Sequence, residues 1–224
     1  MRVGDFVFDV PSGLIASRLY ACGGVLPLHG LLDDAAFAAL EAECAAARAS
    51  ARRNVLAESA LDGPVEERGG SPCRAFTAAP GSVVQWSIFS APALVAAVEE
   101  QCGLSATPTG GGTYSYYEQD GDYLALHRDI AQCDLTLITC LDITPTAGRD
   151  DGALVVYTRH LGLSLAEVAR AGRASATAMP IDRGNTIALL GGIVPHEVTA
   201  MPPGQRRIVS VMCYRVSIDH APLS

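Results

Sequence analysis

The second half of the chain is a series of short runs rich in β-branched and aromatic residues, and this texture limits the folds open to it. Turn-forming residues separate the runs. About eight short strands at this close spacing are typical of a jelly roll or a barrel. The predicted strands cover residues 113–118, 122–128, 134–143, 153–158, 177–180, 186–190, 194–200 and 206–216.

The first half carries helical signals. An alanine-rich segment, 35–51, follows an aspartate cap candidate in Leu31-Leu32-Asp33-Asp34 and has arginines toward its end, as the helix dipole favours. Ser90-Ala91-Pro92 predicts the start of a second helix that runs to about Glu100, because proline is favoured in a first turn. We also expect a strand at 3–10, a short helix at 164–171 capped by Ser164, and a long surface loop at 62–80. That loop is either a lid over a site or a variable insertion.

Length and composition predict one globular domain. The chain has 224 residues, of which 49% are hydrophobic and 18% charged. Mainly β folds of this size commonly form a single unit. We therefore expect one domain over 1–224, with 1–112 supplying helices and first strands and 113–216 supplying the β core.

Charge excludes several classes of function. The net charge is −8, and all 16 basic residues are arginines. Without lysine, neither a lysine Schiff base nor a Walker-type phosphate site can form. An acidic chain without a basic cluster predicts no nucleic-acid partner, and no apolar run reaches the ~18 residues of a membrane span.

The cysteines predict a reducing compartment. Seven cysteines are scattered without any Cys-x-x-Cys pair. This pattern fits neither a zinc knuckle nor a dense disulfide framework. We therefore expect reduced thiols and a cytoplasmic protein, with Cys133 and Cys140 as small buried hydrophobes.

Two residues at the end of one predicted strand form the first part of a candidate metal site. His127 and Asp129 are two positions apart, so they project to the same face of an extended strand. His196 begins a much later strand, and a jelly roll can bring such distant strands together. Two histidines and a carboxylate form the facial triad of non-haem Fe(II) oxygenases. Arg206 could then bind a carboxylate through paired hydrogen bonds.

Five ordered motifs resemble the Fe(II)/2-oxoglutarate-dependent dioxygenase superfamily, closest to its prolyl-4-hydroxylase-like branch. The first is Tyr117…Gly121…Tyr123…His127-x-Asp129. The others are Asp151-Gly152-Ala153-Leu154, Gly184-Asn185-Thr186, His196-Glu197-Val198 and Gly204-Gln205-Arg206, with Asp151 in place of the usual first glycine. The likeness extends over most of the chain and implies a double-stranded β-helix core.

The resemblance also implies roles for individual residues. His127, Asp129 and His196 would bind Fe(II), and Arg206 would hold the distal carboxylate of the cosubstrate 2-oxoglutarate. Tyr117 is similar to a tyrosine that hydrogen-bonds the cosubstrate in some relatives, and Ser210, on the same strand face as Arg206, could assist. Arg207 is the competing candidate and would face the opposite side. We favour Arg206, ten positions after His196 (206 − 196 = 10) in a Gly-x-Arg pattern.

The implied reaction is oxidation of an unactivated C–H bond with O₂ and 2-oxoglutarate. Asp129 favours hydroxylation, desaturation or ring closure over halogenation, because related halogenases typically have a small residue there. The expected substrate is a small molecule, such as an amino acid or a secondary-metabolite intermediate. The alternatives are a hydroxylase of protein side chains and a non-catalytic, cupin-like metal-binding protein.

Overall fold

The structure is a computed structural model that describes residues 12–57, 68–110, 112–144 and 151–217. The strand expected at 3–10 and the first part of the loop expected at 62–80 lie outside these residues. Within the rest of that loop, 68–73 is neither helix nor strand, as expected, but Arg74–Pro80 is a strand and departs from the prediction. Its alanines and terminal proline are poor strand formers, so local pattern did not reveal it.

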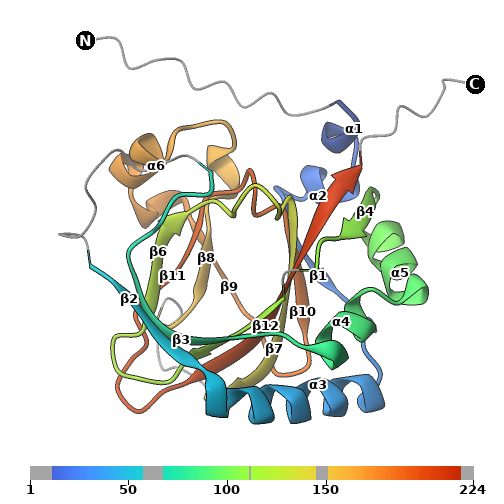
Figure 1. Cartoon of the computed structure of the whole chain (residues 1–224). Helices are drawn as coiled ribbons and strands as arrows, with labels where there is room; N and C mark the ends of the chain where they lie inside the picture. The colour runs from blue at the N-terminus through green and yellow to red at the C-terminus, as the bar shows by residue number, and fades with distance from the viewer. Residues whose placement is uncertain (1–11, 58–67, 111, 145–150, 218–224) are drawn as a thin grey trace, which may run out of the picture.

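Twelve strands form one curled antiparallel sheet, in the order β1-β10-β7-β12-β5-β3-β6-β11-β8-β9, with β2 paired to β3 and β4 to β12 (Figure 1). All eight strands expected after residue 112 are present. The strands are β1 (Val25–Leu28), β2 (Arg52–Leu56), β3 (Arg74–Pro80), β4 (Ser105–Pro108), β5 (Thr113–Tyr117), β6 (Tyr123–His127), β7 (Leu135–Ile143), β8 (Leu154–Val156), β9 (Thr177–Met179), β10 (Thr186–Leu189), β11 (His196–Val198) and β12 (Arg207–Ser217).

Strand β3 is where the sheet curls. It pairs with β5 through Thr77 and Tyr116 and with β6 through Arg74 and Leu124. The strands therefore enclose a common interior, as the ring of arrows in Figure 1 shows. This is the expected double-stranded β-helix, a mainly β jelly roll with helices from the first half of the chain.

The helices lie outside the ring (Figure 1). The two predicted from the first half are confirmed: α3 is capped by Asp33, whose side chain accepts from the Ala36 amide, and α5 ends at Gly103 in the left-handed conformation. Ser164 caps α6 in a capping box. The helices are α1 (Ser12–Ile15), α2 (Arg18–Ala21), α3 (Asp34–Ala47), α4 (Val83–Phe89), α5 (Pro92–Cys102) and α6 (Leu165–Ala171), with short 3₁₀ turns at Arg48–Ser50, Thr158–His160 and Arg173–Ser175.

Buried tyrosines of the sheet fix the helices to its outer face. The hydroxyl of Tyr114 donates to Glu43 of α3 at 2.6 Å, and that of Tyr116 donates to the Cys44 carbonyl at 2.7 Å. Because side chains alternate along a strand, Thr113, Ser115 and Tyr117 of β5 face the interior of the ring instead. Among the described helices, none is long and apolar enough to cross a membrane.

Candidate metal centre and its cavity

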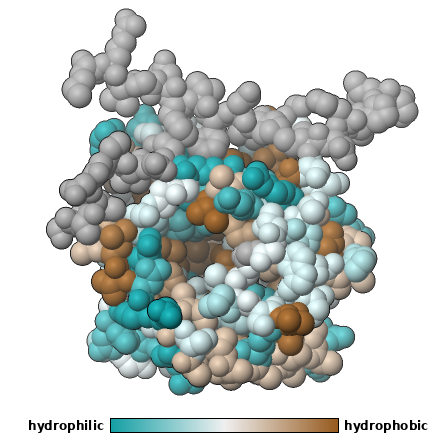
Figure 2. All heavy atoms as spheres, in the orientation of Figure 1, coloured by the Kyte–Doolittle hydropathy of each residue, from teal (hydrophilic) through white to brown (hydrophobic). Residues whose placement is uncertain are grey.

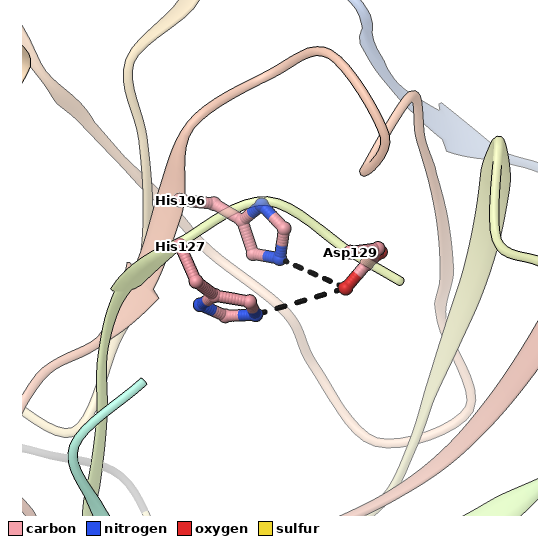
Figure 3. A group of neighbouring side chains, drawn as sticks. All are labelled: His127, Asp129 and His196. Atoms are coloured by element: carbon pink, nitrogen blue, oxygen red, sulfur yellow. Dashed lines mark ion pairs between the residues drawn. The ribbon is translucent and has the colours of Figure 1, made fainter. Parts of the chain in front are cut away.

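The three predicted metal ligands meet inside the ring. His127 ends β6, His196 begins β11, and these two residues are direct partners in the β6–β11 pairing. Their imidazole centroids are 4.2 Å apart. Asp129 follows β6 by two positions and turns its carboxylate toward both rings (Figure 3). Strand pairing thus joins residues that are far apart in sequence.

The ligand atoms converge on one point. Asp129 Oδ1 lies 3.6 Å from Nε2 of His127 and 3.5 Å from Nε2 of His196. One potential ligand atom from each residue falls within 4.8 Å of the others. Such a group of two imidazoles and one carboxylate matches the facial triad that leaves further coordination positions open.

Backbone carbonyls orient both imidazoles. Nδ1 of His127 lies 2.8 Å from the Ala125 carbonyl, and Nδ1 of His196 lies 2.9 Å from the Val194 carbonyl. A carbonyl can only accept, so Nδ1 carries the proton in each ring. Nε2 of each ring therefore faces Asp129 and is the atom available to a metal, which is the arrangement that metal-binding histidines require.

Asp129 is held by its neighbours. Its Oδ2 accepts a hydrogen bond from the Thr136 hydroxyl, and its amide donates to the Gly191 carbonyl at 2.8 Å. A Cβ atom on Gly191 would collide with this carboxylate, so only glycine fits there. Oδ1 is thereby left to face the histidines.

The cluster favours a bound cation. Burial opposes the charged form of Asp129, but the two imidazoles together hold its pKa far below its usual range. Burial, aided by His196, lowers the pKa of His127. Burial also opposes the charged form of His196, yet Asp129 raises its pKa overall. An ionised carboxylate beside imidazole lone pairs is the donor set of a divalent metal site.

These ligands line a cavity of about 350 Å³ in the centre of the ring. The space-filling view is hollowed at this position (Figure 2). The cavity wall is mainly apolar and includes Phe76, Leu124, Leu154, Val198 and Val209.

The two neighbouring arginines lie on opposite faces of β12. Arg207 is 3% exposed and lines the cavity. The side chain of Arg206 is 57% exposed and pairs with Asp142 on the outside at 2.7 Å. The expected placement of Arg206 in the site is therefore wrong, because β12 turns odd-numbered side chains inward.

Arg207 is a buried cation with spare donors. Its Nη1 donates to the Gly152 carbonyl at 2.8 Å, but its buried Nε has no hydrogen-bond partner. No carboxylate of the described residues forms an ion pair with it. Burial lowers its pKa, the usual effect on a cation taken out of water. A buried charge of this kind calls for an anion.

The other two expected cosubstrate residues differ in position. Tyr117 lines the cavity next to Arg207, whose guanidinium carbon lies 5.6 Å from the ring centroid. Ser210 shares the outer face with Arg206 and is bonded to Nε2 of Gln85 at 2.8 Å. Ser210 therefore does not reach the cavity.

A disulfide on the cavity wall was not expected. The structure joins Cys133 to Cys213, and both residues line the cavity. The expectation of a free Cys133 is therefore wrong, while Cys140 is a buried free thiol as expected. The pairing arises because Cys213 in β12 and the residues before β7 become neighbours only in the sheet. Thr136 also lines the cavity, and no sequence motif indicated that it belongs to the site.

Comparison with known proteins identifies the fold. No protein-family model and no curated protein sequence matches the chain. Among solved structures, the epimerase SnoN in complex with Fe³⁺, α-ketoglutarate and nogalamycin RO is 16% identical, with a TM-score of 0.63 over 87% of this chain and 80% of SnoN. The carbocyclase SnoK from nogalamycin biosynthesis is 13% identical, with a TM-score of 0.61 over 94% of this chain and 85% of SnoK.

A prolyl-4-hydroxylase from Pseudomonas putida is 17% identical, with a TM-score of 0.57 over 89% of this chain and 96% of that enzyme. Sequence identities this low support a shared fold and nothing more. The chain therefore has the double-stranded β-helix fold of the 2-oxoglutarate/Fe(II) oxygenases, with a His127–Asp129–His196 cluster inside it.

Proposed function

We propose that this chain is an Fe(II)- and 2-oxoglutarate-dependent oxygenase that oxidises an unactivated C–H bond of a small molecule. One observation carries the proposal: a buried arginine with no acidic partner among the described residues shares one cavity with three convergent metal-type ligands. A metal and a carboxylate ligand would complete this site. The full chain would act as one oxygenase domain.

The residues fit ferrous iron. His127 and His196 present their Nε2 atoms, and Asp129 presents an ionised oxygen, which leaves room for other ligands on the metal. When bound, iron with 2-oxoglutarate and O₂ supplies the oxidising chemistry as the keto acid is converted to succinate and CO₂. The chain's part is to position the reactants and exclude water.

Arg207 would hold the distal carboxylate of 2-oxoglutarate. Its unpartnered Nε and its remaining Nη donors can form a two-point bond with a carboxylate. Tyr117 would assist, since no described residue bonds its hydroxyl and burial raises its pKa, so that it stays a neutral donor. Arg207 replaces Arg206 in this role, and Ser210 has none.

A small substrate fits the cavity best. A volume of about 350 Å³ lies at the lower end of the range for small-molecule sites, roughly 300–1,000 Å³, and must also hold 2-oxoglutarate. SnoN and SnoK come from the biosynthesis of a small molecule. A hydroxylase of peptidyl side chains is the second candidate, because a prolyl-4-hydroxylase shares the fold.

Anaerobic titration tests the assignment. Fe(II) and 2-oxoglutarate added together should give a metal-to-ligand charge-transfer band in the visible spectrum. His127→Ala and Asp129→Ala should abolish it, whereas His160→Ala, outside the cluster, should not. Absence of the band in the wild type would refute the proposal. A band without succinate release in air would instead favour the non-catalytic metal-binding alternative.

A further inference from the structure

A second arginine, Arg74, faces the same cavity from a different strand. It begins β3, the strand at which the sheet curls, and pairs with Leu124 of β6. Leu124 in turn pairs with Val198 of β11, the residue two positions after the metal-site histidine His196. Two residues of strand span ~6.6 Å, so Arg74 lies about one row of side chains away from the metal centre.

The guanidinium of Arg74 is fixed in place but only partly used. Its Nε donates to Asn54 Oδ1 at 2.9 Å, and its Nη1 donates to the Pro72 carbonyl at 3.1 Å. Nη2 forms no hydrogen bond with any described residue, and one Nη1 proton also remains. Within the described part of the chain, Arg74 has no carboxylate partner. Its half-buried position lets a ligand reach the free side.

Several other arginines of the protein have acidic partners. Arg48 pairs with Glu118 at 2.7 Å, Arg173 with Glu197 at 2.8 Å, and Arg206 with Asp142 at 2.7 Å. On the cavity wall, by contrast, the carboxylate of Asp129 is the sole acidic group among the lining residues, and it faces the histidines. Among the described residues, the charge of Arg74 therefore has no acidic partner and is available to a ligand.

Arg74 and Arg207 form separate subsites. The order β12-β5-β3 places their strands two steps apart, which is roughly 10 Å at the usual spacing of about 4.8 Å. Arg207 lies beside Tyr117 and is assigned to the cosubstrate, whereas Arg74 lies beside Asn54, whose amide nitrogen can also donate. The cosubstrate therefore leaves Arg74 free.

The surroundings of Arg74 suit a carboxylate on an apolar body. The apolar side chains of Phe76, Leu124 and Leu154 line the same cavity. A phosphate dianion would call for more than one cation, and Asn54 supplies only a neutral donor beside Arg74. A carboxylate needs two donors in one plane, which the free side of a guanidinium presents.

We propose that Arg74, held by Asn54, binds the carboxylate of the substrate, so that the enzyme oxidises small carboxylic acids with an apolar body. This inference rests on the proposed oxygenase function and names its substrate class. Arg74 sets which end of the molecule points away from the metal and thus which carbon is presented for oxidation.

Binding of three probes with the same six-carbon chain tests the inference. The protein is loaded with Co(II), which does not turn over, and saturated with 2-oxoglutarate to occupy Arg207. Hexanoate, hexanamide and hexylamine are then titrated by calorimetry into wild type, Arg74→Gln and Arg74→Glu. Arg52→Gln is the matched control, because Arg52 is exposed on the neighbouring strand β2. The affinity for 2-oxoglutarate is measured in every protein.

Wild type and Arg52→Gln should bind hexanoate about 10-fold or more tightly than hexanamide, the gain expected of a charge-assisted hydrogen-bond pair. Arg74→Gln should remove that preference, and Arg74→Glu should favour hexylamine, with 2-oxoglutarate affinity unchanged in both. Equal binding of hexanoate and hexanamide by wild type, or no binding of hexanoate, overturns the carboxylate subsite while 2-oxoglutarate still binds. If the wild type does not bind 2-oxoglutarate, the proposed oxygenase function is refuted, and so is this inference.

Discussion

The hydroxyl of Thr136 donates to Oδ2 of Asp129, so that the carboxylate offers only Oδ1 to the two histidines. Thr136 lies on β7 and Asp129 lies seven positions earlier, outside any strand. The sheet thus fixes the rotation of a metal ligand through a second residue. Outer partners of this kind commonly change metal affinity by about 10–100-fold when removed.

Replacement of Thr136 by valine should weaken metal binding. We expect Thr136→Val to raise the Kd for Co(II) by about 10-fold or more, because the carboxylate loses its fixed orientation. Thr136→Ser should retain the wild-type value. Thr139→Val is the matched control, since the Thr139 hydroxyl bonds to Thr186 away from the cavity. Equal metal affinities of Thr136→Val and Thr139→Val, measured by calorimetry, would contradict this role.

Arg207 and Arg206 should respond in opposite ways to substitution. Arg207→Met should weaken 2-oxoglutarate binding by roughly 30-fold or more, because loss of one partner of a buried charge pair costs about 2–5 kcal/mol. Arg206→Gln removes only an exposed ion pair, worth about 0–1 kcal/mol, and should change the Kd less than about 5-fold.

The free energy of unfolding without cosubstrate tests whether the buried charge of Arg207 lacks a partner within the chain. Methionine removes a buried charge that no described carboxylate compensates, so the free energy of unfolding of Arg207→Met should be unchanged or higher in the absence of 2-oxoglutarate. Chemical denaturation checks this. A decrease of more than ~1 kcal/mol would show that Arg207 is already compensated within the chain.

The disulfide should contribute measurably to stability. Cys133 and Cys213 are 80 positions apart, and closing a long loop stabilises a fold by about 2–4 kcal/mol. Cys213→Ser should therefore lower the free energy of unfolding by that amount, whereas Cys22→Ser, at an exposed free thiol, should leave it unchanged.

Thiol titration gives a direct check on the same pair. Of the seven cysteines in the chain, five are free in the structure. Protein purified without reductant and then denatured should react with five equivalents of a thiol reagent. Seven equivalents would disprove the disulfide.

Glu43 should make stability depend on acid pH. Its carboxylate accepts from the Val84 and Gln85 amides at the start of α4 and from the Tyr114 hydroxyl. Burial opposes ionisation of Glu43, but these bonds together lower its pKa below the ordinary value of 4.5. A carboxyl whose pKa falls on folding stabilises the fold above its unfolded pKa, and this contribution is lost as pH drops through the folded value.

Comparison of variants across pH tests this linkage. Glu43→Gln should cost about 1–2 kcal/mol near pH 7, as the loss of a helix cap does. The difference from wild type should shrink as pH falls below about 4.5, because Glu43 of the unfolded wild type is protonated there before Glu43 of the folded protein. Glu100→Gln, at an exposed position of α5, should show no such difference. A difference for Glu43→Gln that stays constant down to pH 3 would contradict the assignment.

Much of the fold and the metal site follows from local pattern. Runs of β-formers bounded by turns located the eight strands from β5 to β12, and the caps Asp33 and Ser164 located two helices. Two-residue alternation placed His127 and Asp129 together, and the ability of a jelly roll to pair distant strands made His196 the third candidate. These features depend on neighbours in the sequence, so the sequence was sufficient for them.

Pairing between distant strands decided the rest. Alternation showed that Arg206 and Arg207 face opposite ways, but the inward face is set by the pairing of Arg207 with Tyr117 in β5. That one-residue difference also moved Ser210 out of the site. Three further contacts form only when the sheet curls. They are the Cys133–Cys213 bond, the hydrogen bond from Thr136 to Asp129 and the hydrogen bond from Arg74 to Asn54. The sequence by itself determined the strands and the type of metal ligand, whereas register and curvature decided which side chains share the cavity, because a shift of one residue turns a strand's side chains to the other face.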